Sequence, residues 1–70
     1  MKPHEQFGLN LRHQRQQHGL SQEALGRACD LHPTEISRLE RATREPRLST
    51  IVRLAHALKV KPARLLDGIE

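Results

Sequence analysis

The stretch Leu20–Glu40, LSQEALGRACDLHPTEISRLE, decides how the rest of this 70-residue chain is arranged. In its second half, Ile36 and Leu39 lie three residues apart and therefore on one face of a helix. Pro33 suits the first position of that helix, where no N–H donor is needed, and His32 is the expected cap residue before it. The other side of the predicted helix carries short hydrogen-bonding groups and two guanidinium groups: Thr34, Ser37, Arg38 and Arg41.

The first half of the stretch predicts another short helix. Ser21 is a strong N-cap candidate, and apolar residues then recur at the spacing of a buried stripe: Leu25, Ala28 and Cys29. Gly26 costs about 1 kcal/mol in helix propensity relative to alanine, so we expect its missing side chain to let another helix approach closely. A turn at Asp30 and Leu31 joins the two helices, and the stretch is therefore predicted to be a helix-turn-helix.

The remaining segments predict three more helices and no strand. Glu5–Gln17 is helix-prone, with Phe7 and Leu11 one turn apart and Leu9 expected on the exposed side. A fourth helix follows from the apolar spacing of Leu48, Ile51, Leu54, Ala55 and Leu58, with Arg47 in the usual cap position. A short fifth helix is expected near Pro62, with Leu65 and Leu66 turned inward. We expect tails at residues 1–4 and 68–70 and one domain over residues 5–67.

Composition favours a single small domain with a polyanionic partner. Twelve Lys and Arg against eight Asp and Glu give a net charge of +4, and nine of the twelve are arginine, which suits phosphate and guanine. A merely solvated surface is the alternative. The single aromatic residue, Phe7, argues against single-stranded nucleic acid, which stacks on aromatic side chains. One cysteine excludes an internal disulfide, and no apolar run nears the ~20 residues of a membrane span, so a cytoplasmic protein is expected.

The chain resembles the Cro/phage-repressor (Xre-like) family of DNA-binding domains from about Phe7 to Leu66. The positions that carry the resemblance are Arg15, Gly19, Leu20, Ser21, Gln22, Leu25, Leu31, Ile36, Ser37, Leu39, Glu40, Pro46, Leu48, Leu54, Ala55, Leu58 and Val60. The resemblance implies a compact five-helix, lambda-repressor-like domain. Asp30 and Ala42 stand where the family usually has glycine; aspartate tolerates a left-handed turn, whereas the turn at Ala42 is expected to take another shape.

Glu40 is expected to turn toward the interior, where a carboxylate needs a partner. The residues alone indicate only that some arginine must lie near it. The resemblance implies that Arg15 is this partner, in an ion pair beneath the recognition helix that holds two helices in register.

The predicted contacts with duplex DNA divide into two groups. The helix that begins at Pro33 would read base edges in the major groove through its N-terminal end and outer face, at Pro33, Thr34, Ser37 and Arg38. The resemblance implies that Gln22 would bind a phosphate. Further phosphates would be bound by the charged loop after the helix that begins at Pro33, at Arg41, Thr43, Arg44 and Arg47. For that loop, a simply solvated segment is the alternative.

One such domain covers few base pairs, so we expect a homodimer on a pseudo-palindromic site, joined through the fourth and fifth helices. These two helices carry more apolar residues than their own packing needs. The extra apolar surface would fit a different protein partner equally well. A DNA-binding antitoxin or adaptor, or a part of a longer regulator, is therefore the alternative reading.

An enzyme is not expected. The five histidines include no pair at the spacing of a helical metal site and none in a ligand motif with Cys29. No glycine-rich phosphate loop or nucleophile elbow is present. The sequence therefore predicts no catalytic residue, metal or cofactor.

Overall fold

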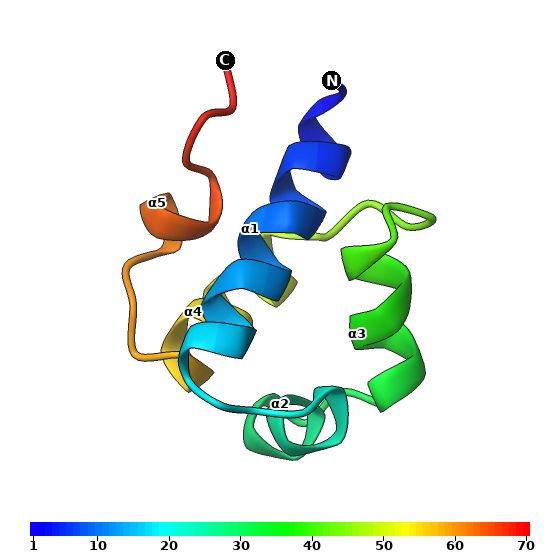
Figure 1. The fold of residues 1–70 in the computed structure, drawn as a ribbon, viewed down its shortest axis with the longest axis vertical. Helices are drawn as coiled ribbons and strands as arrows, with labels where there is room; N and C mark the ends of the chain where they lie inside the picture. The colour runs from blue at the N-terminus through cyan, green and yellow to red at the C-terminus, as the bar shows by residue number, and fades with distance from the viewer.

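Five α-helices and no strands make up the computed structural model, which describes all 70 residues (Figure 1). The helices are α1 (Pro3–Gln17), α2 (Gln22–Cys29), α3 (Pro33–Glu40), α4 (Leu48–Ala57) and α5 (Pro62–Leu65). The prediction of an all-α, five-helix fold is confirmed. None of the five helices has the length and apolar content needed to cross a membrane.

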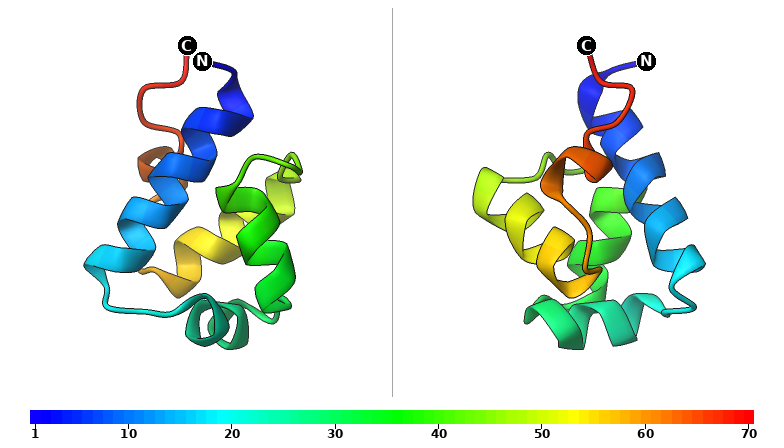
Figure 2. Two further views of the ribbon diagram at one scale, coloured as in Figure 1. Left: turned by 45° about the vertical axis from the view of Figure 1, so that its right-hand side comes forward. Right: turned by 90° about the vertical axis from the view of Figure 1, so that its left-hand side faces the viewer.

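Both ends of the chain contribute to the fold, although residues 1–4 and 68–70 were expected to be tails. Helix α1 begins at Pro3, inside the segment predicted as a tail, because the Lys2 N–H donates to Glu5 Oε1 at 2.7 Å and closes the first turn. That hydrogen bond lowers the pKa of Glu5. At the other end, Ile69 packs against the core. The two termini lie close together at one end of the molecule (Figure 2).

Helix α1 lies between α3 and α5. It packs against α3 on one side and α5 on the other, whereas α4 packs against α2 and α5 (Figures 1 and 2). Asn10 Nδ2 donates to the carbonyls of Leu65 and Asp67, at 2.9 and 2.8 Å, and so holds the end of α5 on α1. The largest fully buried side chains come from all five helices or their ends: Phe7, Leu11, Leu25, Ile36, Leu39, Leu54, Leu58 and Leu65.

The predicted caps of the helix-turn-helix are confirmed. Ser21 Oγ accepts from the Ala24 N–H at 3.0 Å, and His32 Nδ1 accepts from the Thr34 N–H at 3.1 Å. Each bond satisfies one of the N–H groups that a helix leaves free at its start. Arg47 occupies the cap position of α4 and makes no such side-chain bond.

Both turns where the family usually has glycine are left-handed. Asp30 has φ 58°, as predicted, and Ala42 has φ 62°. The expectation of a different turn at Ala42 is therefore wrong. The Thr43 N–H donates to the Arg38 carbonyl at 3.0 Å, and the Ala42 N–H to the Leu39 carbonyl at 3.2 Å. These two bonds form a Schellman motif, which imposes the left-handed conformation whatever residue stands there.

Three apolar residues predicted to be inside are exposed. Ala28 is on the outer side of α2, because Gly26 takes the inward place beside Leu25 and Cys29. Leu48 is 76% exposed at the first position of α4, and Leu66 is 40% exposed just after α5. Leu9 is exposed, as expected. Burial raises the pKa of the Cys29 thiol.

The close approach of α1 to the end of α3 depends on Gly8, a residue that no sequence pattern indicated. A Cβ at Gly8 would lie 2.7 Å from the carbonyl oxygens of Leu39 and Glu40, so only glycine lets α1 lie directly on the end of α3. At Gly26 a Cβ would meet the Leu31 carbonyl of the following turn and would lie 3.5 Å from the backbone nitrogen of Pro33, the first residue of α3. The start of another helix therefore approaches Gly26, as expected.

Candidate nucleic-acid interface

Helix α3 lies along one side of the molecule with its outer face open (Figures 1 and 2). Ile36 and Leu39 are buried, which fixes the rotation of the helix. Of the four residues predicted to read bases, Thr34 and Arg38 are exposed, whereas Pro33 and Ser37 are half-buried. The interior side of α3 thus determines which polar groups it presents outward.

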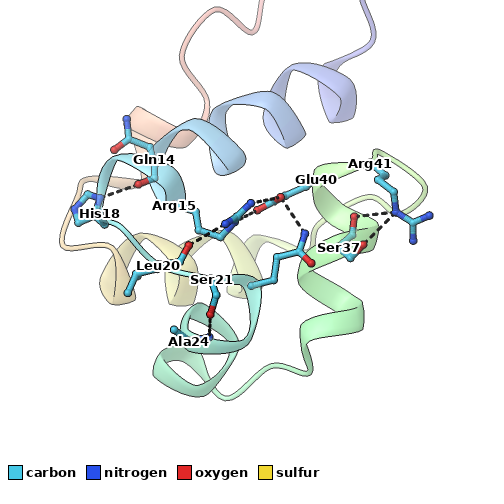
Figure 3. A network of polar contacts seen from close by, with 10 residues as sticks. Gln14, Arg15, His18, Leu20, Ser21, Ala24, Ser37, Glu40 and Arg41 are labelled. Atoms are coloured by element: carbon cyan, nitrogen blue, oxygen red, sulfur yellow. Dashed lines mark hydrogen bonds and ion pairs between the residues drawn. The ribbon is translucent and has the colours of Figure 1, made fainter.

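Ser37 and Arg41 form a local pair on this face. Arg41 Nε donates to Ser37 Oγ at 3.1 Å and more weakly to the Ser37 carbonyl at 3.4 Å (Figure 3). Ser37 keeps its own O–H for donation, and most of the Arg41 guanidinium points away from the helix (Figure 3). Arg38 stands between these two residues in the sequence, and its side chain takes part in none of the hydrogen bonds or ion pairs of the chain.

The loop after α3 is closed by Thr43 and carries two exposed arginines. Thr43 Oγ1 donates to the Arg38 carbonyl at 3.3 Å and so reinforces the end of α3. Arg44 and Arg47 are exposed and line a cleft between this loop and α4. Glu35 and Glu45 line the same cleft, so its charge is mixed.

An ion pair between Arg15 and Glu40 lies beneath the interface. Arg15 Nε donates to Glu40 Oε2 at 2.6 Å and Nη2 to Oε1 at 3.1 Å, with the two side chains 12% and 4% exposed (Figure 3). Arg15 Nη1 also donates to the Leu20 carbonyl at 2.8 Å. The hydrogen bond to Glu40 raises the pKa of Arg15. One bidentate pair thus joins α1, the end of α3 and the segment that leads into α2.

Gln22 belongs to the same network. Its Nε2 donates to Glu40 Oε1 at 3.2 Å, which places the first residue of α2 beside the last residue of α3. The structure therefore brings Gln22 close to the end of α3 where Arg41 follows, although nearly twenty residues separate them in sequence. Every fully buried side-chain nitrogen and oxygen in the chain has a hydrogen-bond partner.

Arg53 is a residue that the sequence argument missed. From α4, its Nη2 donates to the carbonyls of Cys29 and Asp30, at 2.7 and 2.9 Å, and so ties α4 to the turn of the helix-turn-helix. No local signal reveals this contact, because its partners lie more than twenty residues earlier in the chain.

Known proteins with similar sequences and folds are regulators. A family model described as "Helix-turn-helix" matches residues 11–65. Control protein C.BamHI of Bacillus amyloliquefaciens is 45% identical over 62 residues, which cover 87% of this chain and 76% of that protein. The restriction-modification controller protein C.AhdI from Aeromonas hydrophila superposes with a TM-score of 0.86 at 37% identity, covering 89% of this chain and 94% of that one. The P22 c2 repressor protein, solved in complex with synthetic operator 9T, has a TM-score of 0.81 at 32% identity, covering 89% of this chain and 94% of that one.

Proposed function

Because this chain belongs to the helix-turn-helix family of DNA-binding transcriptional regulators, we propose that it recognises a pseudo-palindromic operator as a homodimer with α3 in the major groove. The observation that carries the proposal is the outer face of α3, where Arg38 is exposed and unpaired next to Thr34. Two relatives are named as control or controller proteins, which favours that branch of the family for this chain.

The dimensions of α3 fit the proposed docking. A helix with its side chains is about 10–12 Å in diameter, which matches the major groove of B-DNA at about 12 Å wide, and the eight residues of α3 give it a length of about 12 Å. In this arrangement Arg38 would bind the O6 and N7 atoms of a guanine, the commonest specific contact of arginine. Thr34 would offer a hydroxyl and a methyl group, and Ser37 an O–H, whereas Pro33 has no side-chain donor and would contribute shape alone.

Phosphate contacts would hold α3 in register. We assign them to Gln22 at the start of α2, to Arg41 and Thr43 at the end of α3, and to Arg44 and Arg47 in the loop. The Thr43 hydroxyl donates to the Arg38 carbonyl within the chain, so it must leave that carbonyl before it can donate to a phosphate, which has no hydrogen of its own to offer. The ion pair of Arg15 and Glu40 would support these residues from beneath and touch no DNA.

The proposed dimer surface is the apolar area that α4 and the end of α5 leave uncovered. Val52 and Leu66 are each 40% exposed and lie in two different hollows, Leu66 with Ile51 and Ile69, and Val52 with Ala28 and Ala57. A second copy that covered these apolar side chains would bury additional apolar surface. A 70-residue chain buries little such surface within its own core and is therefore only marginally stable.

The test is selection of binding sites from random duplexes by the wild-type chain at two salt concentrations, with the mass of the free protein measured in parallel. The proposal predicts enrichment of a two-fold-symmetric site and a species of about 16 kDa, twice the 8.0 kDa chain. If no duplex is enriched and the chain remains at 8.0 kDa, the proposal is wrong, and an antitoxin or adaptor that acts with another protein becomes the better account.

A further inference from the structure

We propose that Arg53 is a positioning residue that sets the half-site spacing at which the dimer can bind DNA, by fixing the helix-turn-helix to α4. This inference rests on the proposed operator-binding homodimer. It concerns a residue that lies outside the predicted DNA contacts and acts through the turn between α2 and α3.

Arg53 closes the carboxyl end of α2. The last carbonyls of a helix lack partners within it and carry the negative end of its dipole. Arg53 Nη2 donates to two of these groups, the Cys29 and Asp30 carbonyls, at 2.7 and 2.9 Å. The Asp30 carboxylate lies 4.0 Å from the same nitrogen and is fully exposed, so it adds little. A single cationic group from α4 therefore holds the left-handed residue at which α2 turns into α3.

No other side-chain hydrogen bond links α4 to the helix-turn-helix, and α3 itself packs mainly on α1 and α2. The orientation of α3 relative to α4 is thus transmitted through α2 and its turn. The Arg53 side chain is 45% exposed and lies outside the buried core. Its two charge-assisted hydrogen bonds should therefore affect the position of the turn more than the free energy of unfolding.

In a dimer joined through α4 and α5, the angle between α4 and α3 determines how far apart the two recognition helices lie. Half-sites are read about 34 Å apart, and one added base pair displaces them by about 3.4 Å and turns them by about 35°. A dimer in which the helix-turn-helix is rigidly fixed to α4 binds the altered spacing poorly, whereas a dimer in which this link is loose can still bind both half-sites. Losing the two bonds of Arg53 should therefore relax the spacing requirement.

The test compares wild type with Arg53→Met, which keeps the aliphatic stem and removes the donors, and with Arg12→Met, which removes the same charge from an exposed site on α1, outside the proposed DNA and dimer surfaces. Binding is measured to the selected symmetric duplex, to the same duplex with one base pair added or removed at its centre, and to a single half-site. We expect wild type and Arg12→Met to lose at least about tenfold in affinity on the altered spacings, and Arg53→Met less than about threefold. Half-site affinity should be the same for Arg53→Met and Arg12→Met, and Arg53→Lys should recover part of the selectivity.

The outcomes separate the two proposals. If wild type selects no symmetric site, the operator proposal fails and the role of Arg53 fails with it. If wild type discriminates between spacings and Arg53→Met does so equally, only the role of Arg53 is wrong. An Arg53→Met chain that does not fold at 25 °C also contradicts the inference, because Arg53 would then be a stability residue.

Discussion

Arg38 and Ser37 are neighbours in sequence but differ in how free they are to contact DNA. The Ser37 hydroxyl already accepts a hydrogen bond from Arg41, whereas the Arg38 guanidinium is exposed and unpaired. The sequence predicted that both residues face outward, since helical spacing determines the face. It could not predict the pairing, which depends on the side-chain conformations of residues one turn apart.

Replacing Arg38 tests base reading at a single residue. Arg38→Ala should lose the preference for one guanine per half-site and weaken binding to the selected duplex by about 5- to 150-fold per half-site contact. The salt dependence should change little, because a base contact neutralises no phosphate. Binding titrations at several salt concentrations measure both quantities, with Arg12→Ala, at an exposed site on α1, as a control of equal charge. A uniform loss on every sequence, with a shallower salt slope, would make Arg38 a phosphate ligand instead.

Ala42 adopts a backbone conformation that an alanine disfavours. A left-handed residue other than glycine costs about 1–2 kcal/mol, and part of that is offset because glycine loses more chain entropy on folding. Ala42→Gly should therefore raise the free energy of unfolding by about 0.5–1 kcal/mol. Urea unfolding measures this change. The control is Ala28→Gly, at an exposed position inside α2, which should lower the free energy of unfolding by about 1 kcal/mol. If both variants lowered this free energy equally, the left-handed conformation at Ala42 would be contradicted.

At the scale of the helices, the sequence predicted each element because the signals are local. Caps at Ser21 and His32 and the proline at Pro33 lie within one turn of the helix starts that they mark. The errors concern residues at the margins of the apolar faces. Periodicity indicates a face, but it does not show where neighbouring helices stop covering it, and so Leu48 and Leu66 were wrongly placed inside.

Contacts between helices were less predictable. The crossing at Gly8 depends on where the end of α3 passes, which nothing within α1 reveals. The pairing of Arg15 with Glu40 came from the family resemblance, since the residues alone required only an unspecified arginine. The contact of Gln22 with Glu40 was not foreseen at all, because its role was assigned from its place at the start of α2.

Removing Glu40 should separate helices that this carboxylate joins. Glu40→Ala leaves the Arg15 guanidinium buried without its partner, which costs about 3–5 kcal/mol. A core of this size supplies only about as much in total, so the variant should be largely unfolded at 25 °C. Thermal and urea unfolding followed by circular dichroism measure the effect, with the exposed Glu23→Ala as control. A melting curve that matches wild type would contradict the structural role of the pair.

At the scale of the whole molecule, the proposed DNA-binding surface is assembled from three places in the chain: the start of α2, the outer face of α3 and the loop before α4. Their residues were predicted because they fall within or next to one motif. Arg53 and Asn10, which tie α4 and α5 to the rest, were not predicted, since their partners lie more than twenty and more than fifty residues away. Local patterns thus led to the surface proposed to bind DNA, whereas the contacts that hold this surface in place could be found only in the folded chain.

The central claim is that this chain distinguishes one duplex sequence from another through α3. The most direct measurement is the ratio of two dissociation constants at about 0.15 M salt, for the selected symmetric duplex and for a duplex with the same base pairs in shuffled order. If α3 reads base pairs, wild type should bind the selected duplex at least about a thousandfold more tightly. Equal affinity for the two duplexes would show that the chain binds DNA through its charge alone and would contradict sequence recognition by α3.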